Sequence, residues 1–279
     1  MTFKTLPGKS GEEVIFAIGD IHGQAGALRH ALSRIRERPA GGPPAHLVFT
    51  GDVIDRGPDN LDAIDAVLNA RELAQVDRVT VLPGNHEVMF LEAVRSPHLS
   101  MNLWAQNGGM ALIDELDPAG KARSVSDVAS MLEEALPDFM GIIEAAPDHL
   151  RIGDLLFVHA GISPHHDMTA FLSQPRHGPW DFEEHWLWIR APFLEHRGGW
   201  NGEDDLVVVH GHTPHNGQAY LDGESAGAAL DHVAESRRIC LDAGAMSLDQ
   251  VALLEVADGD YRIEAIHDPD RSPSPCHAP

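Results

Sequence analysis

Cysteine and long apolar runs are both scarce in this chain. Its 279 residues include only two cysteines, too few for a disulfide framework, so we expect a reducing compartment. Cys240 lies in an apolar run and is expected in the core, whereas Cys276 lies in a Pro- and Ser-rich tail and is expected to be exposed. No stretch approaches the roughly 18 apolar residues of a membrane helix, and no signal peptide is visible. These absences predict a cytoplasmic protein with no membrane partner.

Positive charge is scarce as well. The chain has 20 Lys and Arg residues against 43 Asp and Glu residues, which gives a formal net charge of −23. Proteins that bind nucleic acid or an anionic membrane surface need a basic patch, so this balance argues against both kinds of partner. An acidic protein is compatible with a site for divalent cations, because negative charge raises their local concentration.

Side chains of the types that bind metals recur in five short segments. These segments are residues 19–23 (GDIHG), 51–57 (GDVIDRG), 84–87 (GNHE), 159–161 (HAG) and 210–214 (HGHTP). Asp, His and Asn together supply the oxygen and nitrogen donors that a pair of divalent ions needs. Two such ions, about 3.5–4 Å apart, form a clamp for displacement reactions at phosphorus. We therefore interpret the five segments as parts of one dimetal site.

An apolar, strand-like run lies directly before each of these segments. The runs are residues 14–18, 47–49, 79–82, 155–158 and 206–209. Such runs are typical of strands buried on both faces, and ligands of α/β sheets bind beyond the carboxyl ends of the strands. Asp20, Asp52 and Asn85 follow one another at 32 and 33 residues, which fits strand–helix–strand units of roughly 30 residues. The pattern predicts an α/β protein in which all five segments meet at one rim of one sheet.

Helices are predicted between the strands. Apolar residues at helical spacing indicate helices over residues 25–38 and 60–74, and a further helix over 88–94 continues from the GNHE motif. Ser126 is a candidate N-cap, and Pro137 is expected to open the next helix. Near the end of the chain, three strand-like runs are expected to pair antiparallel; they are residues 238–242, 250–256 and 261–266.

The motifs resemble the phosphoprotein phosphatase family of calcineurin-like metallophosphoesterases, in which GDxHG, GDxxDRG, GNHE, H-(G/A)-G and a final His occur in this order. The resemblance covers about residues 14–244 and is strongest to the bacterial and phage serine/threonine phosphatase branch, because of HGHTP and the later WIR and LDAGA stretches. It implies an α/β fold with a central β-sandwich flanked by helices. Because the motifs span nearly the whole chain, we predict a single domain over residues 1–270. Residues 114–150 are interpreted as a helical insertion, and residues 271–279 as a disordered tail.

The family pattern assigns the metal ligands residue by residue. The implied ligands are Asp20, His22, Asp52, Asn85, His159 and His212. Asp52 would bridge the two ions, because a carboxylate has two oxygens to offer. In the last segment the family's ligand follows the Gly, which selects His212, and His210 is expected to pack or hydrogen-bond nearby. Nitrogen and oxygen donors without sulfur suit two divalent ions such as Mn, Fe or Zn.

The resemblance also implies the catalytic groups. A hydroxide that bridges the two ions attacks phosphorus, and His86, oriented by Asp55, protonates the leaving alkoxide. Arg56 and Arg190 would hold the phosphate oxygens. Three other arginines of the later segments remain alternatives to Arg190, namely Arg151, Arg176 and Arg197. Pro83 occupies a position where the family usually has Arg, which puts one phosphate contact in doubt.

These motifs favour a serine/threonine protein phosphatase that acts on a phosphorylated protein or peptide. The alternative on the same fold is a symmetrical dinucleoside-polyphosphate hydrolase, whose family shares GDxHG and HAGI. That family typically has Ala at the position of Asp55 and GNHD instead of GNHE, so Asp55 and Glu87 favour the phosphatase. An alternative of another class is a non-catalytic metal-binding interaction module, but such modules often lose a ligand, and all six are present here.

Overall fold

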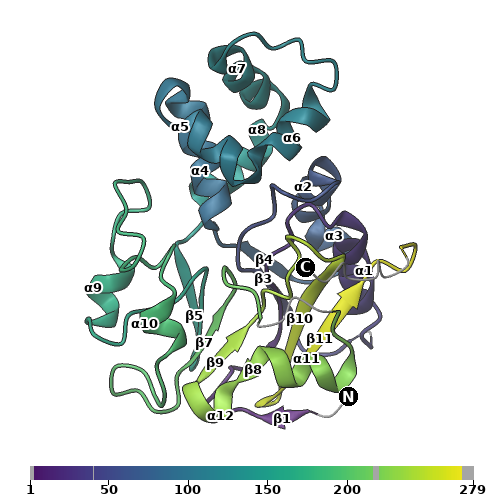
Figure 1. Cartoon of the computed structure of the whole chain (residues 1–279). Helices are drawn as coiled ribbons and strands as arrows, with labels where there is room; N and C mark the ends of the chain where they lie inside the picture. Colours follow the sequence, from purple (N-terminus) through teal and green to yellow (C-terminus); the bar gives the residue numbers. More distant parts are fainter. Residues whose placement is uncertain (1–2, 40, 216–219, 272–279) are drawn as a thin grey trace.

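Two β-sheets with helices around them make up the body of the protein, and a lobe of helices projects beyond one end of the sheets (Figure 1). The computed structural model describes residues 3–39, 41–215 and 220–271. The predicted α/β sandwich flanked by helices is confirmed. Cys276 and all but the first residue of the predicted tail lie outside the described residues.

The first sheet has the strand order β1-β11-β10-β2-β3-β4. Its parallel strands β2, β3 and β4 correspond to the three apolar runs that precede the GDIHG, GDVIDRG and GNHE segments. A long antiparallel hairpin and a short edge strand complete it. The bounds are β1 Lys4–Thr5, β2 Val14–Ile18, β3 Ala45–Phe49, β4 Arg78–Val81, β10 Gln250–Ala257 and β11 Asp260–His267.

The second sheet has the strand order β5-β6-β7-β9-β8. Its central strands β6, β7 and β9 are parallel, and β5 and β8 are antiparallel edge strands. The bounds are β5 His149–Ile152, β6 Leu155–Val158, β7 Val207–His210, β8 Asp231–His232 and β9 Arg238–Cys240.

Two of the predictions about strand arrangement are wrong. The five strands before the metal-type segments belong to two sheets, because β6 and β7 pair with each other and not with β2, β3 or β4. Strand β9 pairs in parallel with β7, so it is not part of the antiparallel group with β10 and β11. Apolar runs identify strands but carry no information about partners that lie far away in the sequence.

Strand β2 is buried on both faces, as its uninterrupted apolar sequence predicted. Ile15 and Ala17 belong to the same apolar cluster as Phe157 of the second sheet, so this cluster lies between the sheets. Phe16 and Ile18 belong to a second cluster that includes the buried face of the first helix. Successive side chains of a strand point to opposite faces, which is why one short run contributes to two cores.

Helices α1 (Ala25–Arg36), α2 (Asn60–Leu68) and α3 (Ala70–Ala74) connect the parallel strands of the first sheet. The helix predicted over residues 60–74 is therefore two helices. The chain leaves helical geometry at Asn69, whose side chain donates to the carbonyl oxygen of Asp65 at 2.9 Å. The Asn69 backbone N–H donates to the same carbonyl at 3.0 Å, and such side-chain bonds to the backbone favour Asn at helix ends.

The projecting lobe follows the third parallel strand and lies at the top of Figure 1. Helix α7 is capped by Ser124, whose hydroxyl accepts from the Asp127 N–H at 3.2 Å, and not by Ser126 as predicted. Pro137 opens α8 as predicted. The bounds in this region are α4 Asn85–Arg95, α5 Pro97–Trp104, a π-helical turn η1 Ala105–Gly109, α6 Met110–Leu116, α7 Val125–Ala135 and α8 Pro137–Ala145.

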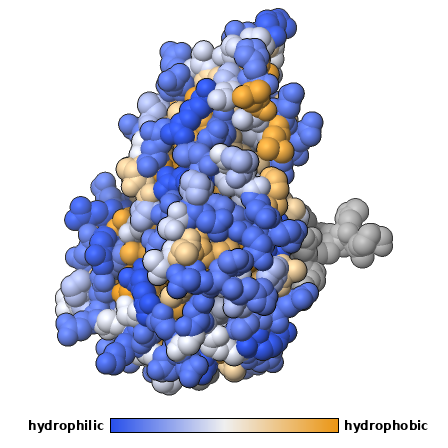
Figure 2. Space-filling model, turned by 90° about the vertical axis from the view of Figure 1, so that its left-hand side faces the viewer, coloured by the Kyte–Doolittle hydropathy of each residue, from blue (hydrophilic) through white to orange (hydrophobic). Residues whose placement is uncertain are grey.

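Short helices interrupt the later loops. They are α9 Met168–Leu172, α10 Ala191–Leu194, α11 Gly223–Leu230 and α12 Val233–Ser236. Among the described residues, no helix combines the length and the apolar character that crossing a bilayer requires. The face shown in Figure 2 is mainly hydrophilic, with small separate apolar areas on the lobe and on the body.

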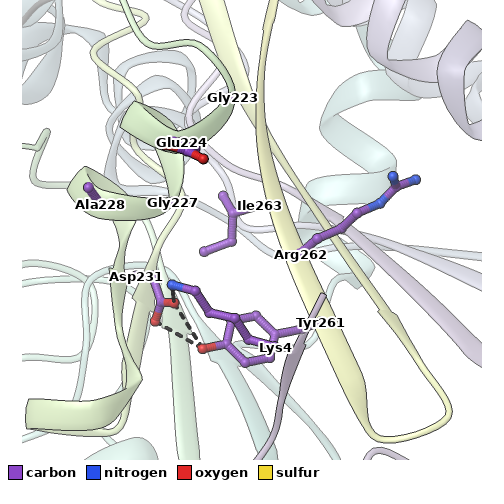
Figure 3. Close-up of a pocket in the computed structure, with 9 residues that line it drawn as sticks. All are labelled: Lys4, Gly223, Glu224, Gly227, Ala228, Asp231, Tyr261, Arg262 and Ile263. Carbon is purple, nitrogen blue, oxygen red and sulfur yellow. Dashed lines mark hydrogen bonds and ion pairs between the residues drawn. The ribbon is translucent and has the colours of Figure 1, made fainter. Parts of the chain in front are cut away.

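A cavity of about 320 Å³ lies where edge strands of the two sheets meet, beneath α11 (Figure 3). Lys4 of β1 donates to the Asp231 carboxylate of β8 at 2.5 Å, and the Tyr261 hydroxyl donates to the same carboxylate at 2.9 Å. These contacts join the edges of the two sheets. None of the predicted metal-binding or catalytic residues lines this cavity.

Candidate dimetal active site

All six predicted metal ligands come together where the parallel strands end. Asp20 and His22 follow β2, Asp52 follows β3, and Asn85 is the first residue of α4 after β4. The second sheet contributes His159 after β6 and His212 after β7. The ligands are buried, with at most 6% of any of them exposed. The two sheets therefore supply one site from both sides.

Asp52 is shared by two groups of side chains that could each hold a metal ion. The first group is His22, Asp52 and His86, and the second is Asp52, His159 and His212; in each group the ligand atoms lie within 4.8 Å of one another. His22 Nε2 is 3.7 Å from Asp52 Oδ2, and His159 Nε2 is 3.5 Å from Asp52 Oδ1. The two oxygens of Asp52 thus face different histidines, as a bridging carboxylate requires.

Hydrogen bonds to the main chain fix the orientation of the imidazoles. His22 Nδ1 lies 2.9 Å from the Ile54 carbonyl oxygen, and His159 Nδ1 lies 2.8 Å from that of Thr50. Each ring therefore directs its Nε2 atom inward. A histidine that donates one ring N–H to a carbonyl keeps the other nitrogen free for a metal.

Asn85 completes the second group. Its Oδ1 atom lies 2.9 Å from both His159 Nε2 and His212 Nδ1. His212 in turn holds Asp20 through its backbone N–H, which is 3.0 Å from both carboxylate oxygens. His210 is not in either group. It is buried, its ring packs edge-on against Phe193 at 4.8 Å between centroids, and its Nδ1 lies 2.9 Å from the Gly211 carbonyl.

Left-handed backbone is concentrated at the site. His22, Asp52, Asp55, Arg56 and His212 all have φ between +45° and +76°. Residues other than Gly adopt this region at a cost of order 1–3 kcal/mol each, and such strain is typical of functional sites. The strain persists here because surrounding hydrogen bonds and packing hold the loops in place.

Two glycines allow the close approach of main chain to the carboxylates. A Cβ atom on Gly211 would lie 1.9 Å from Asp20 Oδ1, and one on Gly84 would lie 2.1 Å from Asp52 Oδ1. Any larger residue at either position would displace a ligand. The motifs therefore require glycine directly before His212 and Asn85 for steric reasons.

Glu87 has a structural role that the sequence did not reveal. Its buried carboxylate accepts from the N–H groups of Asp52 (2.8 Å), Val53 (2.8 Å), Ile54 (3.3 Å) and Gly84 (2.9 Å). Burial and the Asp52 charge raise the pKa of Glu87 to about 7, against the opposing effect of these N–H groups. Glu87 therefore fixes the loop that carries Asp52. Of the two residues that favour a phosphatase, Asp55, and not Glu87, is hydrogen-bonded to His86.

His86, a member of the first group of side chains that could hold a metal ion, forms a buried pair with Asp55. His86 Nδ1 is 2.7 Å from Asp55 Oδ2, and the indole N–H of Trp104 donates to the same oxygen at 2.8 Å. Burial opposes a charge on His86, but Asp52 and Asp55 outweigh it and raise the pKa of His86 above its usual value. His86 Nε2 is buried and has no hydrogen-bond partner among the described residues, so it is available to a ligand.

Only some of the candidate arginines are near the site. Arg56 Nη1 lies 3.3 Å from His22 Nε2. Arg190 is exposed, but partial burial of its guanidinium lowers its pKa, and the charges of Asp52, Arg56 and Asp20 also act on it, so it lies within electrostatic range of the site. The three alternatives have other partners: Arg151 pairs with Glu203, Arg176 with Asp148, and Arg197 donates to Ser236. Among the candidate arginines, Arg56 and Arg190 are therefore the two whose charges act at the site.

Asp242 was missed as a site residue. It is buried, follows β9 and interacts with Asp20, and burial raises its pKa to about 6. Burial and the Asp242 and Asp52 charges likewise raise the pKa of Asp20 well above its usual value. The sequence could have identified Asp242, because it follows a buried strand in the same way as the predicted ligands do.

The residues fit a pair of divalent cations. Three buried carboxylates lie close together, those of Asp20, Asp52 and Asp242. Negative charges that are not compensated are unfavourable in a protein interior, so these carboxylates favour the binding of cations. Burial lowers the pKa of His22 to about 3, and also lowers the pKa of His159 and His212, so these imidazoles are neutral and can bind a metal. The nitrogen and oxygen donor set contains no thiolate.

The chain matches the protein family described as calcineurin-like phosphoesterase over residues 14–235. It is 37% identical over 95 residues to serine/threonine-protein phosphatase 1 of Salmonella typhimurium. The aligned residues make up 34% of this chain and 38% of that protein. It is 30% identical over 150 residues to the symmetrical bis(5'-nucleosyl)-tetraphosphatase of Methylococcus capsulatus, covering 54% of this chain and 44% of that one. The matched parts span less than half the length of these two relatives.

A solved structure has a similar fold. It is a protein serine/threonine phosphatase from Saccharomyces cerevisiae, with a TM-score of 0.54 and 17% sequence identity. The superposition covers 95% of this chain and 86% of the yeast chain. At this identity the likeness concerns the arrangement of sheets and helices.

Proposed function

The chain belongs to the calcineurin-like phosphoesterase family and is a phosphoester hydrolase, and from this premise we propose that it dephosphorylates phosphoserine or phosphothreonine in proteins. The proposal concerns the substrate, since both phosphatases and dinucleoside tetraphosphatases are among its relatives. The observation that carries it is the buried hydrogen bond between His86 and Asp55.

Asp20, His22, Asp52, Asn85, His159 and His212 would hold two divalent ions. When bound, two such ions supply Lewis-acid polarisation of the phosphoryl group and activation of water. Asp52 would contribute to both positions, because its two oxygens face His22 and His159. Asp242 would position Asp20, with which it interacts.

His86 would donate a proton to the leaving oxygen from Nε2. The alkoxide of serine or threonine is a poor leaving group and needs that proton, whereas a phosphate leaving group does not. Asp55 supports the role in two ways. It raises the pKa of His86, and its hydrogen bond to Nδ1 leaves Nε2, which has no partner among the described residues, as the atom that would donate the proton.

Arg56 and Arg190 would bind the terminal oxygens of the phosphate. Guanidinium groups bind such oxygens with two parallel hydrogen bonds, which orients the phosphorus for in-line attack. Pro83, at the position where the resembled family usually has Arg, offers no cation. A phosphomonoester needs fewer cationic partners than a polyphosphate chain, which would extend over a protein with a net charge of −23.

A dinucleoside-polyphosphate hydrolase is the second candidate, and the sequence similarity to the tetraphosphatase from Methylococcus capsulatus favours it. The distinguishing experiment compares kcat/KM on a phosphoserine or phosphothreonine peptide with kcat/KM on diadenosine tetraphosphate, at the same metal concentration. We expect the higher value on the peptide. The reverse ranking would establish the second candidate, and failure to hydrolyse either with metal present would point to a non-catalytic metal-binding module.

A further inference from the structure

One segment of the helical lobe directly contacts the turn formed by Asp55 and Arg56, which we call the catalytic turn. Trp104, the last residue of α5, donates its indole N–H to Asp55 Oδ2 at 2.8 Å. In the π-helical turn that follows, the carbonyl oxygen of Gly108 accepts from the Arg56 N–H at 3.1 Å, and that of Asn107 accepts from Arg56 Nε at 3.2 Å. The segment thus touches both the residue that orients His86 and an arginine placed at the phosphate.

The π-helical turn makes these carbonyl groups available. Gly108 has φ +120° and ψ −3°, so the helical path is interrupted there. A carbonyl group that leaves the regular helical pattern can accept a hydrogen bond from elsewhere, and π-helical turns are frequent at functional sites. Gly108 is also sterically required, because a Cβ atom would lie 2.5 Å from Arg56 Cγ.

The catalytic turn depends on such outside contacts. Asp55 and Arg56 are consecutive residues with φ of +76° and +70°, which neither favours by itself. The Glu87 carboxylate holds the turn only as far as Ile54. From Asp55 onward, the Arg56 N–H is held by the carbonyl oxygen of Gly108. The Asp55 carboxylate contacts Trp104 as well as His86. The Arg56 side chain contacts Asn107 as well as His22 and Met246.

Trp104 is itself held firmly. It is fully buried, its ring packs against Phe90 at 5.5 Å between centroids, and a Cβ on Gly109 would lie 2.4 Å from its indole. The indole N–H therefore has a fixed direction, toward the carboxylate that His86 also contacts. Its position is set by the lobe and not by the motif that contains Asp55.

We propose that Trp104 and Gly108 are positioning residues of the lobe with separate tasks: Trp104 orients the Asp55–His86 pair for protonation of the leaving group, and Gly108 sets Arg56 for binding of the phosphate. The assignment of tasks rests on the proposed roles of His86 and Arg56. It places part of the catalytic machinery in helices outside the sheet motifs, so the lobe contributes to the reaction.

The first test is Trp104→Phe, which keeps an aromatic ring but removes the N–H donor. Rates are measured on an alkyl phosphate and on an aryl phosphate, whose leaving group needs little protonation. We expect kcat on the alkyl ester to fall by about tenfold, with a loss of less than about threefold on the aryl ester. Inhibition by inorganic phosphate should be unchanged.

The second test is Gly108→Ala, measured in the same assays. The added methyl group displaces Arg56, so KM and the inhibition constant of inorganic phosphate should rise by about tenfold. The alkyl and aryl esters should be affected equally. Phe90→Leu is the packing control for Trp104, and Gly120→Ala is the control for Gly108, because Gly120 also has a left-handed φ but a Cβ there would meet nothing within 4 Å.

The two variants together decide the proposal. If both change the alkyl-to-aryl ratio and phosphate inhibition in parallel, or if the controls reproduce the effects, the segment has only a structural role and the proposal is wrong. Should Trp104→Phe not fold, Gly108→Ala against Gly120→Ala still tests it. A low rate on phosphopeptides with the expected response to both variants would contradict the proposed substrate but uphold this inference.

Discussion

The Nδ1 atom of His86 lies 2.7 Å from Asp55 Oδ2, and both side chains are completely buried. A charged imidazole in such a position is stable only if a negative group compensates it. Asp55 and Asp52 provide that compensation and raise the pKa of His86. The pair thus favours the protonated imidazole beside the predicted metal ligands, where a leaving group would need a proton.

Replacement of His86 tests this interpretation. His86→Asn should retain both metals and lose about 10²–10⁴-fold in kcat on an alkyl phosphate, the usual contribution of a positioned acid. The loss should be much smaller on an aryl phosphate. Because His86 also lies within reach of the first metal group, metal content must be measured by elemental analysis. A variant that loses one metal would identify His86 as a ligand; His98→Asn, at an exposed histidine, is the control.

Metal removal should abolish activity. The predicted ligands are nitrogen and oxygen donors, which suit Mn²⁺, Fe and Zn²⁺. We expect a chelator to stop hydrolysis of an aryl phosphate and Mn²⁺ to restore it. Full activity in protein that elemental analysis shows to be free of metal would contradict the dimetal interpretation.

Asp52→Asn should reduce metal content and turnover together. The amide keeps the shape of the side chain, but it removes the negative charge that both metal positions share. Titration of metal binding by calorimetry, with turnover measured on the same samples, tests the prediction. The matched control is Asp62→Asn, at an exposed position of α2. Near wild-type turnover with two ions bound to Asp52→Asn would exclude the bridging role.

Glu87→Gln should destabilise the protein and lower its activity. Glu87 accepts hydrogen bonds from four backbone N–H groups, and the amide NH₂ of Gln would oppose one or two of them. Leaving buried donors unsatisfied costs about 1–3 kcal/mol each. The free energy of unfolding, measured in urea, should fall by at least that amount. Glu92→Gln on the same helix should change it little, and an equal loss in both variants would contradict the anchoring role.

The stability of the protein should depend on pH partly through His46. Burial, together with the Arg78 charge, lowers the pKa of His46 to about 4 in the folded protein. Between the unfolded value of 6.5 and about 4, the unfolded chain binds a proton that the folded chain does not. Stability from this group is therefore present above pH 6.5 and is lost as the pH falls toward 4.

The measurement is the free energy of unfolding at pH 7 and pH 5 for the wild type and for His46→Gln. Gln can keep a hydrogen bond to Thr80, which His46 Nε2 contacts at 2.8 Å, but it does not titrate. The wild type should lose more stability than the variant over this range. Equal losses would show that the pKa of His46 is not lowered by folding.

The strands that carry the site, and the side chains at their ends, could be predicted from the residues alone. Strand β2 has the predicted bounds, and Asp20, Asp52 and Asn85 follow buried strands as expected. This succeeded because a buried strand and the residue after it form a local pattern. The family resemblance added the identity of the six clustered residues, and the structure brings all of them together.

Contacts between residues far apart in the chain could not be predicted from the sequence. The division of the strands between two sheets, the partnership of Asp242 with Asp20, and the contact of Trp104 with Asp55 across 49 residues have no local signature. The role of Glu87 could not be predicted either, although it belongs to the GNHE motif, because three of its four N–H partners lie 33 to 35 residues away in the sequence. Hydrogen bonds and packing between distant segments depend on how the chain folds back on itself, and composition and periodicity do not record that.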